Sequence, residues 1–328
     1  DPEMSRGLGD VYKRQGYSRG TINSGCVRNR GYELEITATP VLTRDFRWNT
    51  TLTWSKNDNK ILSLAEGADE NQVISTVGTA SIIGRVGGTT GDLWGYKLVR
   101  DPEGNVIIGD NGLPEQADEI EYVGTAYADW KAGWYNEFSY KGFKLGILLD
   151  GQVGGTIYSM SFHKMMEQGK LTQSLNGRLP GTEYYMDAND PRIAAAGYTP
   201  QSGMYMIAPG VVRNDDGTFS PNTKVVTIES FYKEYYRRAN VETNSFDASF
   251  LKIREIRLEY ELPKKVLEKS PFSKASIAVY GRNLWCFTDY PLFDPESVAL
   301  DGSSMVSGIE TGSLPTTRTF GFNLNLTF

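Results

Sequence analysis

Seven segments of this sequence alternate apolar residues with polar or small ones over the length of a β-strand. In the last of them, Phe320, Phe322 and Leu324 alternate with Gly321 and Asn323. A period of two places one kind of residue on each face of a strand. Many glycines and tyrosines, 35 and 19, favour strands and turns over a helical bundle. We predict an all-β chain of antiparallel strands over residues 31–39, 46–56, 130–140, 143–153, 247–260, 274–284 and 318–328.

The connections between these strands are alternately short and long. The short ones are 40–45, 141–142 and 261–273, and the long ones are 57–129, 154–246 and 285–317. An outer-membrane β-barrel has this arrangement, because its periplasmic turns are short and its extracellular loops are long. We predict that the strands form part of a transmembrane barrel wall and that the three long connections are extracellular. Bacterial barrels have at least about eight strands, so about seven would be only a segment of a larger wall.

The alternation also predicts which side chains face lipid and which face the barrel lumen. Aromatic residues should mark the two membrane interfaces. The expected lipid-facing residues include Leu52, Trp134, Leu145, Phe322 and Leu324, and the expected lumen-facing ones include Arg47, Glu137, Arg257 and Asn323. The expected outer girdle holds Trp54, Trp130 and Trp285, and the inner girdle holds Tyr140, Tyr260 and Phe328.

The N-terminal residues show neither helical nor strand periodicity. Residues 1–15 resemble a translated sequencing-adapter scar, and 16–30 are interpreted as the end of a preceding loop. Neither an initiator methionine nor a signal peptide is visible at Asp1. We therefore expect the native protein to extend upstream, with residues 31–328 forming the C-terminal portion of the barrel.

Charge and cysteine content exclude several classes of protein. With 34 Lys and Arg against 40 Asp and Glu, the net charge is −6, which argues against nucleic acid as a partner. Cys26 and Cys286 lie too far apart in the sequence for a disulfide framework or a zinc motif. No cofactor is expected.

No motif in the sequence predicts a catalytic or metal site. His163 is the single histidine, and SMSFHKMMEQ around it resembles no nucleophile motif, so we expect a solvated residue in a short loop helix. Asp294, Glu296 and Asp301 could together ligate Ca²⁺. Solvated carboxylates in a turn are the preferred interpretation, so no metal is expected, and the protein is not expected to be an enzyme.

Aromatic residues are the candidate contacts for substrate or partner, because flat rings with polar neighbours suit sugar faces and protein interfaces. The segment ESFYKEYYRR, 229–238, should form a short helix with its aromatic residues on one side. That side would dock either on the protein's own loops or on a partner. The candidates are Trp94, Tyr96, Tyr184, Tyr185, Tyr205, Tyr232, Tyr235 and Tyr236.

Six segments in order resemble the C-terminal part of SusC/RagA-type TonB-linked outer-membrane transporters. They are NRGYELEITATPV, FRWNTTLTWSKNDNKILSL, ADWKAGWYNEFSYKGFKLGILLDGQVGGTIY, SFDASFLKIREIRLEYELPKKVL, IAVYGRNLWCFTDYPLFDPE and LPTTRTFGFNLNLTF. The resemblance implies a 22-stranded barrel with a plug, of which this chain supplies about a third of the wall. The plug, the TonB-box and the first half of the barrel have no counterpart here.

The same resemblance implies a nutrient importer in the outer membrane of a Gram-negative bacterium. Its partners would be a SusD-like surface lipoprotein, the TonB complex and outer-membrane lipid, and its substrate a glycan or, alternatively, a peptide. Phe328 would be the terminal signal for barrel assembly. Two other interpretations stay open: a secreted β-rich protein that binds or cleaves glycans, and an adhesin barrel without a transport role.

Overall fold

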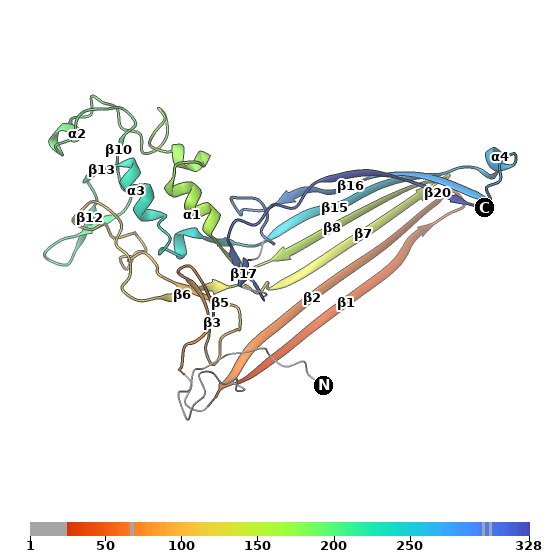
Figure 1. Cartoon of the computed structure of the whole chain (residues 1–328), viewed down its shortest axis with the longest axis horizontal. Coiled ribbons are helices and arrows are strands. Elements are labelled where there is room, and N and C mark those ends of the chain that lie inside the picture. The colour runs from red at the N-terminus through yellow and green to blue at the C-terminus, as the bar shows by residue number, and fades with distance from the viewer. Residues whose placement is uncertain (1–24, 66–68, 297–298, 302–303) are drawn as a thin grey trace, which may run out of the picture.

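The computed structural model describes residues 25–65, 69–296, 299–301 and 304–328. The expectations for residues 1–15 and 16–24 lie outside the described residues. About half of an elongated molecule is one long sheet, and the other half is a thick cluster of short elements at one end of that sheet (Figure 1). We call the sheet the wall and the cluster the headpiece. No helix among the described residues is long and apolar enough to cross a bilayer.

The wall confirms the predicted seven antiparallel strands and their order. Each strand pairs with the one before it among the seven, without a crossover. The hairpin 130–140 and 143–153 has the predicted ends, and its two-residue turn uses Lys141 and Gly142, both at positive φ, as expected for a tight hairpin. The strands are β1 Gly25–Leu42, β2 Phe46–Leu64, β7 Trp130–Tyr140, β8 Phe143–Val153, β15 Phe250–Glu261, β16 Lys274–Phe287 and β20 Thr319–Thr327.

The β1–β2 hairpin is longer than predicted, because its outer part has no apolar alternation. Residues 25–30, expected in a loop, are paired with the second half of β2. Polar side chains hold this part together: Asn57 and Asn59 donate to Asn29, and Arg28 pairs with Asp58. Trp54 therefore lies in the interior of β2, but it pairs with Ala132 and so lies level with the start of β7, close in register to Trp130. Trp130 and Trp285 do lie at the predicted ends of their strands.

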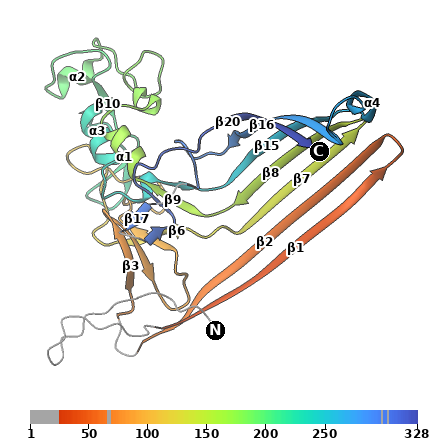
Figure 2. The same ribbon diagram turned by 45° about the vertical axis from the view of Figure 1, so that its right-hand side comes forward.

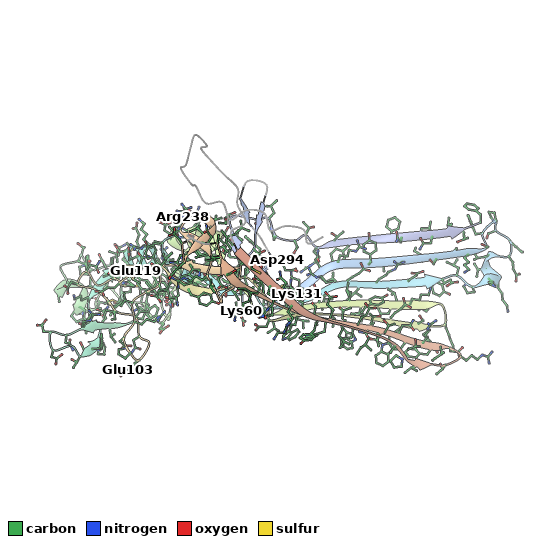
Figure 3. The ribbon with its side chains drawn as sticks, turned by 90° about the horizontal axis from the view of Figure 1, so that it is seen from below. Lys60, Glu103, Glu119, Lys131, Arg238 and Asp294 are labelled. Atoms are coloured by element: carbon green, nitrogen blue, oxygen red, sulfur yellow. The ribbon has the colours of Figure 1, made fainter. Side chains whose placement is uncertain are left out.

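The two faces of the wall differ in chemistry, as the alternation predicted. Strand pairing joins Trp48, Phe138, Leu145, Leu258, Val279 and Phe322 in one row across the sheet. The neighbouring row on the opposite face contains Asn49, Glu137, Gly146, Arg257, Tyr280 and Gly321. Side chains stand out from both faces (Figure 3). The nine residues assigned to the two faces from sequence all lie on the expected face.

Polar groups on the apolar face are hydrogen-bonded to each other. Trp48 donates its indole N–H to Asn136 at 3.0 Å, and Trp134 donates to Thr50 at 2.9 Å. Thr50 and Asn136 are themselves directly opposite each other in the β2–β7 pair. Such pairing removes the cost of leaving an indole N–H unsatisfied in an apolar environment.

The headpiece contains the three long connections, which all leave the wall at the same end (Figure 2). Its sheets are small. Its strands are β3 Gln72–Val77, β4 Ala80–Gly84, β5 Asp92–Gly95, β6 Glu121–Thr125, β9 Thr156–Ser159, β10 Tyr205–Ile207, β11 Val211–Arg213, β12 Phe219–Pro221, β13 Val225–Thr227, β14 Ser245–Asp247, β17 Ala299–Asp301, β18 Ser304–Val306 and β19 Ile309–Glu310. Its helices are α1 Met160–Glu167, α2 Pro191–Ala195 and α3 Ile228–Tyr235, with 3-10 turns at Thr172–Leu175 and Glu242–Asn244. A further short helix, α4 Lys264–Leu267, lies at the opposite end of the wall.

The long connections pack against one another. One apolar cluster combines Leu93 from the first connection, Tyr158 and Val241 from the second and Ile309 from the third. The backbone N–H of Leu98 donates to Glu242 at 3.0 Å, joining the first two connections. Burial of apolar surface within the headpiece therefore offsets the entropy cost of ordering these loops without a partner.

Candidate functional site in the headpiece

Two of the eight candidate aromatic residues are buried in the headpiece core, so their rings are not available to a ligand. Tyr232 is 4% exposed and donates its hydroxyl to the carbonyls of Gln173 and Asn176, each at 3.1 Å. Tyr205 packs against Tyr198, with ring centroids 4.9 Å apart. For Tyr205 and Tyr232 the structure corrects the expectation of a contact surface.

The other six candidates are half-buried, and three of them, Trp94, Tyr235 and Tyr236, pack against other rings. Trp94 lies edge-on to Tyr122 and carries Arg85 over its face at 4.2 Å. Tyr235 and Tyr236 lie edge-on to each other at 4.8 Å. Tyr96 pairs with Asn240 in an isolated bridge, and Tyr184 lies against the main headpiece core. Tyr185 completes the set, and a role for these six in binding stays a prediction.

Helix α3 confirms the short helix predicted around 229–238. Thr227 caps it by accepting from the N–H of Ser230 at 3.1 Å, and Glu229 pairs with Lys233 one turn later. Phe231 and Tyr232 lie in one buried cluster with Phe162 and Met166 of α1. Of the two alternatives for the aromatic side of this helix, docking on the protein's own loops is therefore the one observed.

His163 lies in a short helix as predicted, but it is not solvated. Its side chain is 1% exposed, in the interface of α1 with α3. Nδ1 hydrogen-bonds the carbonyl of Tyr236, and Nε2 lies 3.8 Å from Glu167. Burial lowers the pKa of His163 below 6.5, although the Tyr236 carbonyl and Glu167 act in the opposite direction and Lys164 and Arg238 reinforce the shift. The sequence did not reveal this burial. Apolar residues lie on both sides of His163 in α1, so no single apolar face of the helix could be identified.

We expect the headpiece to lose stability as the pH falls below 6.5. Below this pH the unfolded chain binds a proton at His163 more readily than the folded headpiece does, because the pKa is lower in the folded state. The free energy of unfolding of the headpiece therefore rises as the pH rises through this range. In His163→Phe, the change in headpiece stability between about pH 7.5 and about pH 5.5 should be smaller, as measured by hydrogen exchange at α1 and α3. No other histidine exists in the chain to supply the same effect. An equal pH dependence in the variant and the wild type would refute this role of His163.

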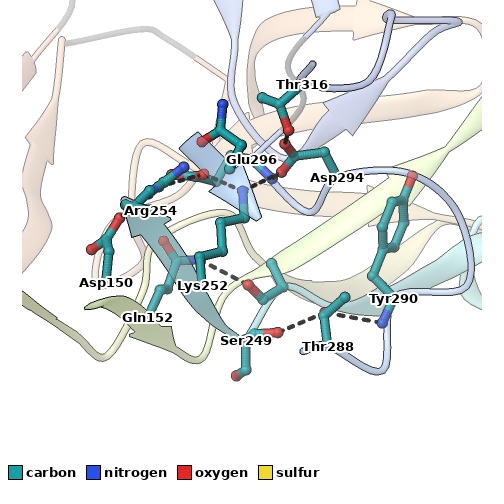
Figure 4. Close-up of polar contacts among 12 residues, drawn as sticks. Asp150, Gln152, Ser249, Lys252, Arg254, Thr288, Tyr290, Asp294, Glu296 and Thr316 are labelled. Carbon is teal, nitrogen blue, oxygen red and sulfur yellow. Dashed lines mark hydrogen bonds and ion pairs between the residues drawn. The ribbon is translucent and has the colours of Figure 1, made fainter. Parts of the chain in front are cut away.

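A cluster of charged side chains fastens the third connection to the outer end of the wall (Figure 4). Lys252 of β15 donates to Asp294 at 2.6 Å and also contacts Glu296. Both the Lys252 and the Asp294 side chains are 4% exposed. Arg254, the extra residue at a bulge in β15, bridges Asp150 of β8 at 2.7 Å and Glu296 at 2.6 Å. Asp294 lies where the wall meets the headpiece (Figure 3).

The Asp294 carboxylate is not solvated, which corrects the interpretation preferred from sequence. Burial by itself would raise its pKa, but hydrogen bonds from Lys252 and from Thr316, at 2.6 Å, outweigh burial and lower it. One Asp294 oxygen is engaged by Lys252 and the other by the Thr316 hydroxyl, and one Glu296 oxygen is engaged by Lys252 and Arg254, so these oxygens are not free to bind Ca²⁺. Among the described residues no group of three or more His, Cys, Asp or Glu could hold a metal ion. The side chain of Asp301 lies outside the described residues.

A second buried carboxylate joins the third connection to α1. Glu310 is 2% exposed and accepts from the Ser159 hydroxyl at 2.6 Å and the Ser161 hydroxyl at 2.8 Å. The backbone N–H groups of Gly312 and Ser313 donate to it as well. A carboxylate at a helix N-terminus is favourable, because the free N–H groups carry partial positive charge. Neither Glu310 nor Lys252 stands out in the sequence, because only folding shows which charged residues lose contact with water.

The comparisons with known proteins agree on one group of relatives. No family model matches the chain. It is 26% identical over 341 residues to TonB-dependent receptor P3 of Formosa agariphila, covering 95% of this chain and 30% of that protein. It is 26% identical over 151 residues to TonB-dependent receptor SusC of Bacteroides thetaiotaomicron, covering 42% of this chain and 15% of SusC.

The solved structures give the same fold. The RagAB peptide importer in its "closed-closed" state superposes with a TM-score of 0.60 at 15% identity, over 95% of this chain and 31% of that one. Its "open-open" state superposes with a TM-score of 0.59 at 14% identity, over 98% and 31%. The chain thus spans about 30% of the length of the proteins that it matches along nearly its whole length. The chain is thus similar in sequence to TonB-dependent receptors, SusC among them, and similar in fold to the RagAB importer, and it matches the C-terminal part of such barrels.

Proposed function

We propose that the protein containing this chain is a TonB-dependent importer in the outer membrane of a Gram-negative bacterium. The observation that carries the proposal is the wall, which has one continuous apolar face and a headpiece at one end only. Large apolar side chains on that face are open to the surroundings; Phe322, for example, is 75% exposed. Exposed apolar surface on this scale marks a contact with lipid or protein. In this proposal the apolar face meets lipid, the polar face lines the lumen and the headpiece is extracellular.

The proposed partners are a SusD-like surface lipoprotein and the TonB complex, the latter acting through parts of the protein outside this chain. The relatives are named as receptors and an importer, which supports transport over enzymatic activity. Because the headpiece has its own core, a lipoprotein would dock on its outer surface and would not be needed to order it.

For the substrate we propose an oligosaccharide or a peptide. Sugar recognition was inferred from the aromatic residues, but Tyr205 and Tyr232 are buried and several others pack on neighbouring rings. The peptide alternative is supported by the similarity in fold to the RagAB peptide importer.

Membrane fractionation followed by affinity purification tests the function. The full-length protein, expressed with its neighbouring genes, should stay in the outer-membrane fraction after a carbonate wash and should co-purify with a lipoprotein in detergent. Release by the wash would favour a secreted protein. Retention as a lone barrel, in cells whose nutrient uptake does not depend on it, would favour an adhesin.

Lysine substitutions on the two faces of β20 test the orientation of the wall. Leu324→Lys should destabilise the full-length barrel by about 2–4 kcal/mol, because it places a charge on the lipid face. Asn323→Lys, one residue away on the polar face, should be tolerated. Unfolding in urea from lipid vesicles measures both, and equal costs at the two positions would contradict the assigned faces.

Phe328 is the proposed assembly signal. It follows the last strand, is exposed and lies 5.0 Å from the ring of Phe272. Phe328→Asp in the full-length protein should lower the amount of folded barrel in the outer membrane, whereas Phe272→Asp, which changes only the neighbouring ring, should not. Surface labelling of cells measures folded protein, and normal levels of the Phe328 variant would rule out this role.

A further inference from the structure

A cavity of about 620 Å³ lies in the headpiece between the end of α1, the start of α3 and the segments around residues 178 and 203. This volume is within the usual range for small-ligand pockets. Helices α1 and α3 are in contact, and both views show them side by side (Figures 1 and 2). The lining combines charged groups with an apolar floor made by Met204 and Ile228. Met204 is 45% exposed, although an apolar side chain of this size gains by burial.

Arg178 gives this cavity a net positive charge, because the lining holds three cationic side chains and two carboxylates. Its side chain is half-buried, and in the described part of the chain its guanidinium makes neither an ion pair nor a hydrogen bond. The other cations of the lining are paired within their own helices, Lys164 with Glu167 at 2.9 Å and Lys233 with Glu229. A guanidinium presents five N–H donors in a planar fork that matches a carboxylate.

The backbone holds Arg178 in place at the cavity. Gly203 has φ +68°, and a Cβ there would lie 2.4 Å from the carbonyl oxygen of Arg178, so no larger residue fits this approach. A Cβ on Gly169, just past the end of α1, would lie 2.8 Å from a guanidinium nitrogen of Arg178. The negative end of the α1 dipole lies nearby and favours a cation at this place. The guanidinium thus lies close to the end of α1, at the wall of the cavity.

The lining contains no aromatic residue. Sugar faces are recognised by stacking on flat rings, which this cavity cannot offer. An aliphatic side chain next to a carboxylate would fit it, with the carboxylate on Arg178 and the aliphatic group on Met204 and Ile228. The paired lysines and glutamates, with Gln168 and Thr227, would hydrogen-bond a peptide backbone.

We propose that this cavity is a binding site for a short peptide, held through a carboxylate on Arg178 and an aliphatic side chain on Met204. The proposal deepens the importer function and rests on it for its physiological meaning. The binding itself is a property of the headpiece and can be measured without uptake.

The test uses the full-length protein in detergent, with ¹³C-labelled methionine methyl groups and titration calorimetry. The probes are tri-leucine with a free C-terminal carboxylate, tri-leucine amide and the neutral trisaccharide maltotriose. We expect tri-leucine to shift the Met204 methyl resonance and to bind at least about tenfold more tightly than the amide, because the amide lacks a charge-assisted hydrogen bond. Maltotriose should leave the Met204 resonance unchanged.

Two substitutions locate the contact. Arg178→Gln should weaken tri-leucine binding at least about tenfold and remove the difference between acid and amide. Arg213→Gln, at an exposed arginine of β11 outside the cavity, is the matched control and should bind like the wild type. Equal binding of tri-leucine and tri-leucine amide by the wild-type protein would overturn the proposal, and this measurement does not depend on the folding of any variant. A shift of the Met204 methyl resonance with maltotriose but not with tri-leucine would overturn it as well. Neither result would affect membrane retention or co-purification with a lipoprotein. The importer function is therefore tested separately from peptide binding in this cavity.

Discussion

Lys252→Met is expected to free the third connection, which in the structure runs from 288 to 318 between β16 and β20, from the outer end of the wall. The substitution leaves Asp294 buried without its cation, and breaking one side of a buried pair costs about 3–5 kcal/mol. The cost falls on the loop and not on the wall, because the strand pairing of β15 does not involve the Lys252 side chain. Limited proteolysis and hydrogen exchange across 288–318 should therefore show faster cleavage and exchange, while β7 and β8 stay protected.

Two further variants separate loss of the ion pair from a general defect. Lys131→Met, at an exposed lysine of β7 near the same junction, should change nothing (Figure 3). Lys252→Met combined with Asp294→Leu should restore much of the protection, because replacing both partners by apolar groups is often close to neutral. If the single variant is as protected as the wild type, the cluster does not hold the loop.

The same cluster should survive mild acid. Because the pKa of Asp294 is lowered, its contribution to stability is complete above its ordinary value of 3.8 and is lost only as the pH falls through the lowered value. The loop should therefore stay attached in the range where the His163 region loosens.

Phe231→Ala is expected to unfold the headpiece core without unfolding the wall. Phe231 is 5% exposed and packs on Tyr232 and Tyr235, at 5.5 and 5.2 Å between ring centroids. Removing a buried phenylalanine costs about 3–5 kcal/mol, a large share of the stability of a small domain. Phe219→Ala, at a half-buried ring in the β11–β12 hairpin outside the core clusters, should cost much less.

Hydrogen exchange resolves the two parts of the molecule. In Phe231→Ala, amides of α1 and α3 should exchange faster, and those of β7, β8 and β15 should not. Simultaneous loss of protection in wall and headpiece would show that the two unfold as one unit, although the apolar core around Phe231 contains no residue of the wall strands.

The order of the wall strands and their two faces could be predicted from sequence, because each strand is amphipathic by itself. Alternation with a period of two depends on neighbours in the chain, so Phe320 to Leu324 or the 130–153 hairpin reveal their faces without knowledge of the fold. The polar outer half of the β1–β2 hairpin was missed for the same reason. Its pairing depends on cross-strand contacts such as Asn29 with Asn59, which leave no periodic signal.

The sequence by itself determined the number, order and two faces of the wall strands, the end at which the long connections gather and the family that the chain resembles. Only the tertiary structure decided what those connections do. Buried states of His163, Lys252, Asp294 and Glu310, and the half-buried, unpaired state of Arg178, arise from contacts between segments far apart in the chain. A charged residue looks the same in sequence whether it meets water or a partner, and only folding sets the local dielectric environment that distinguishes the two.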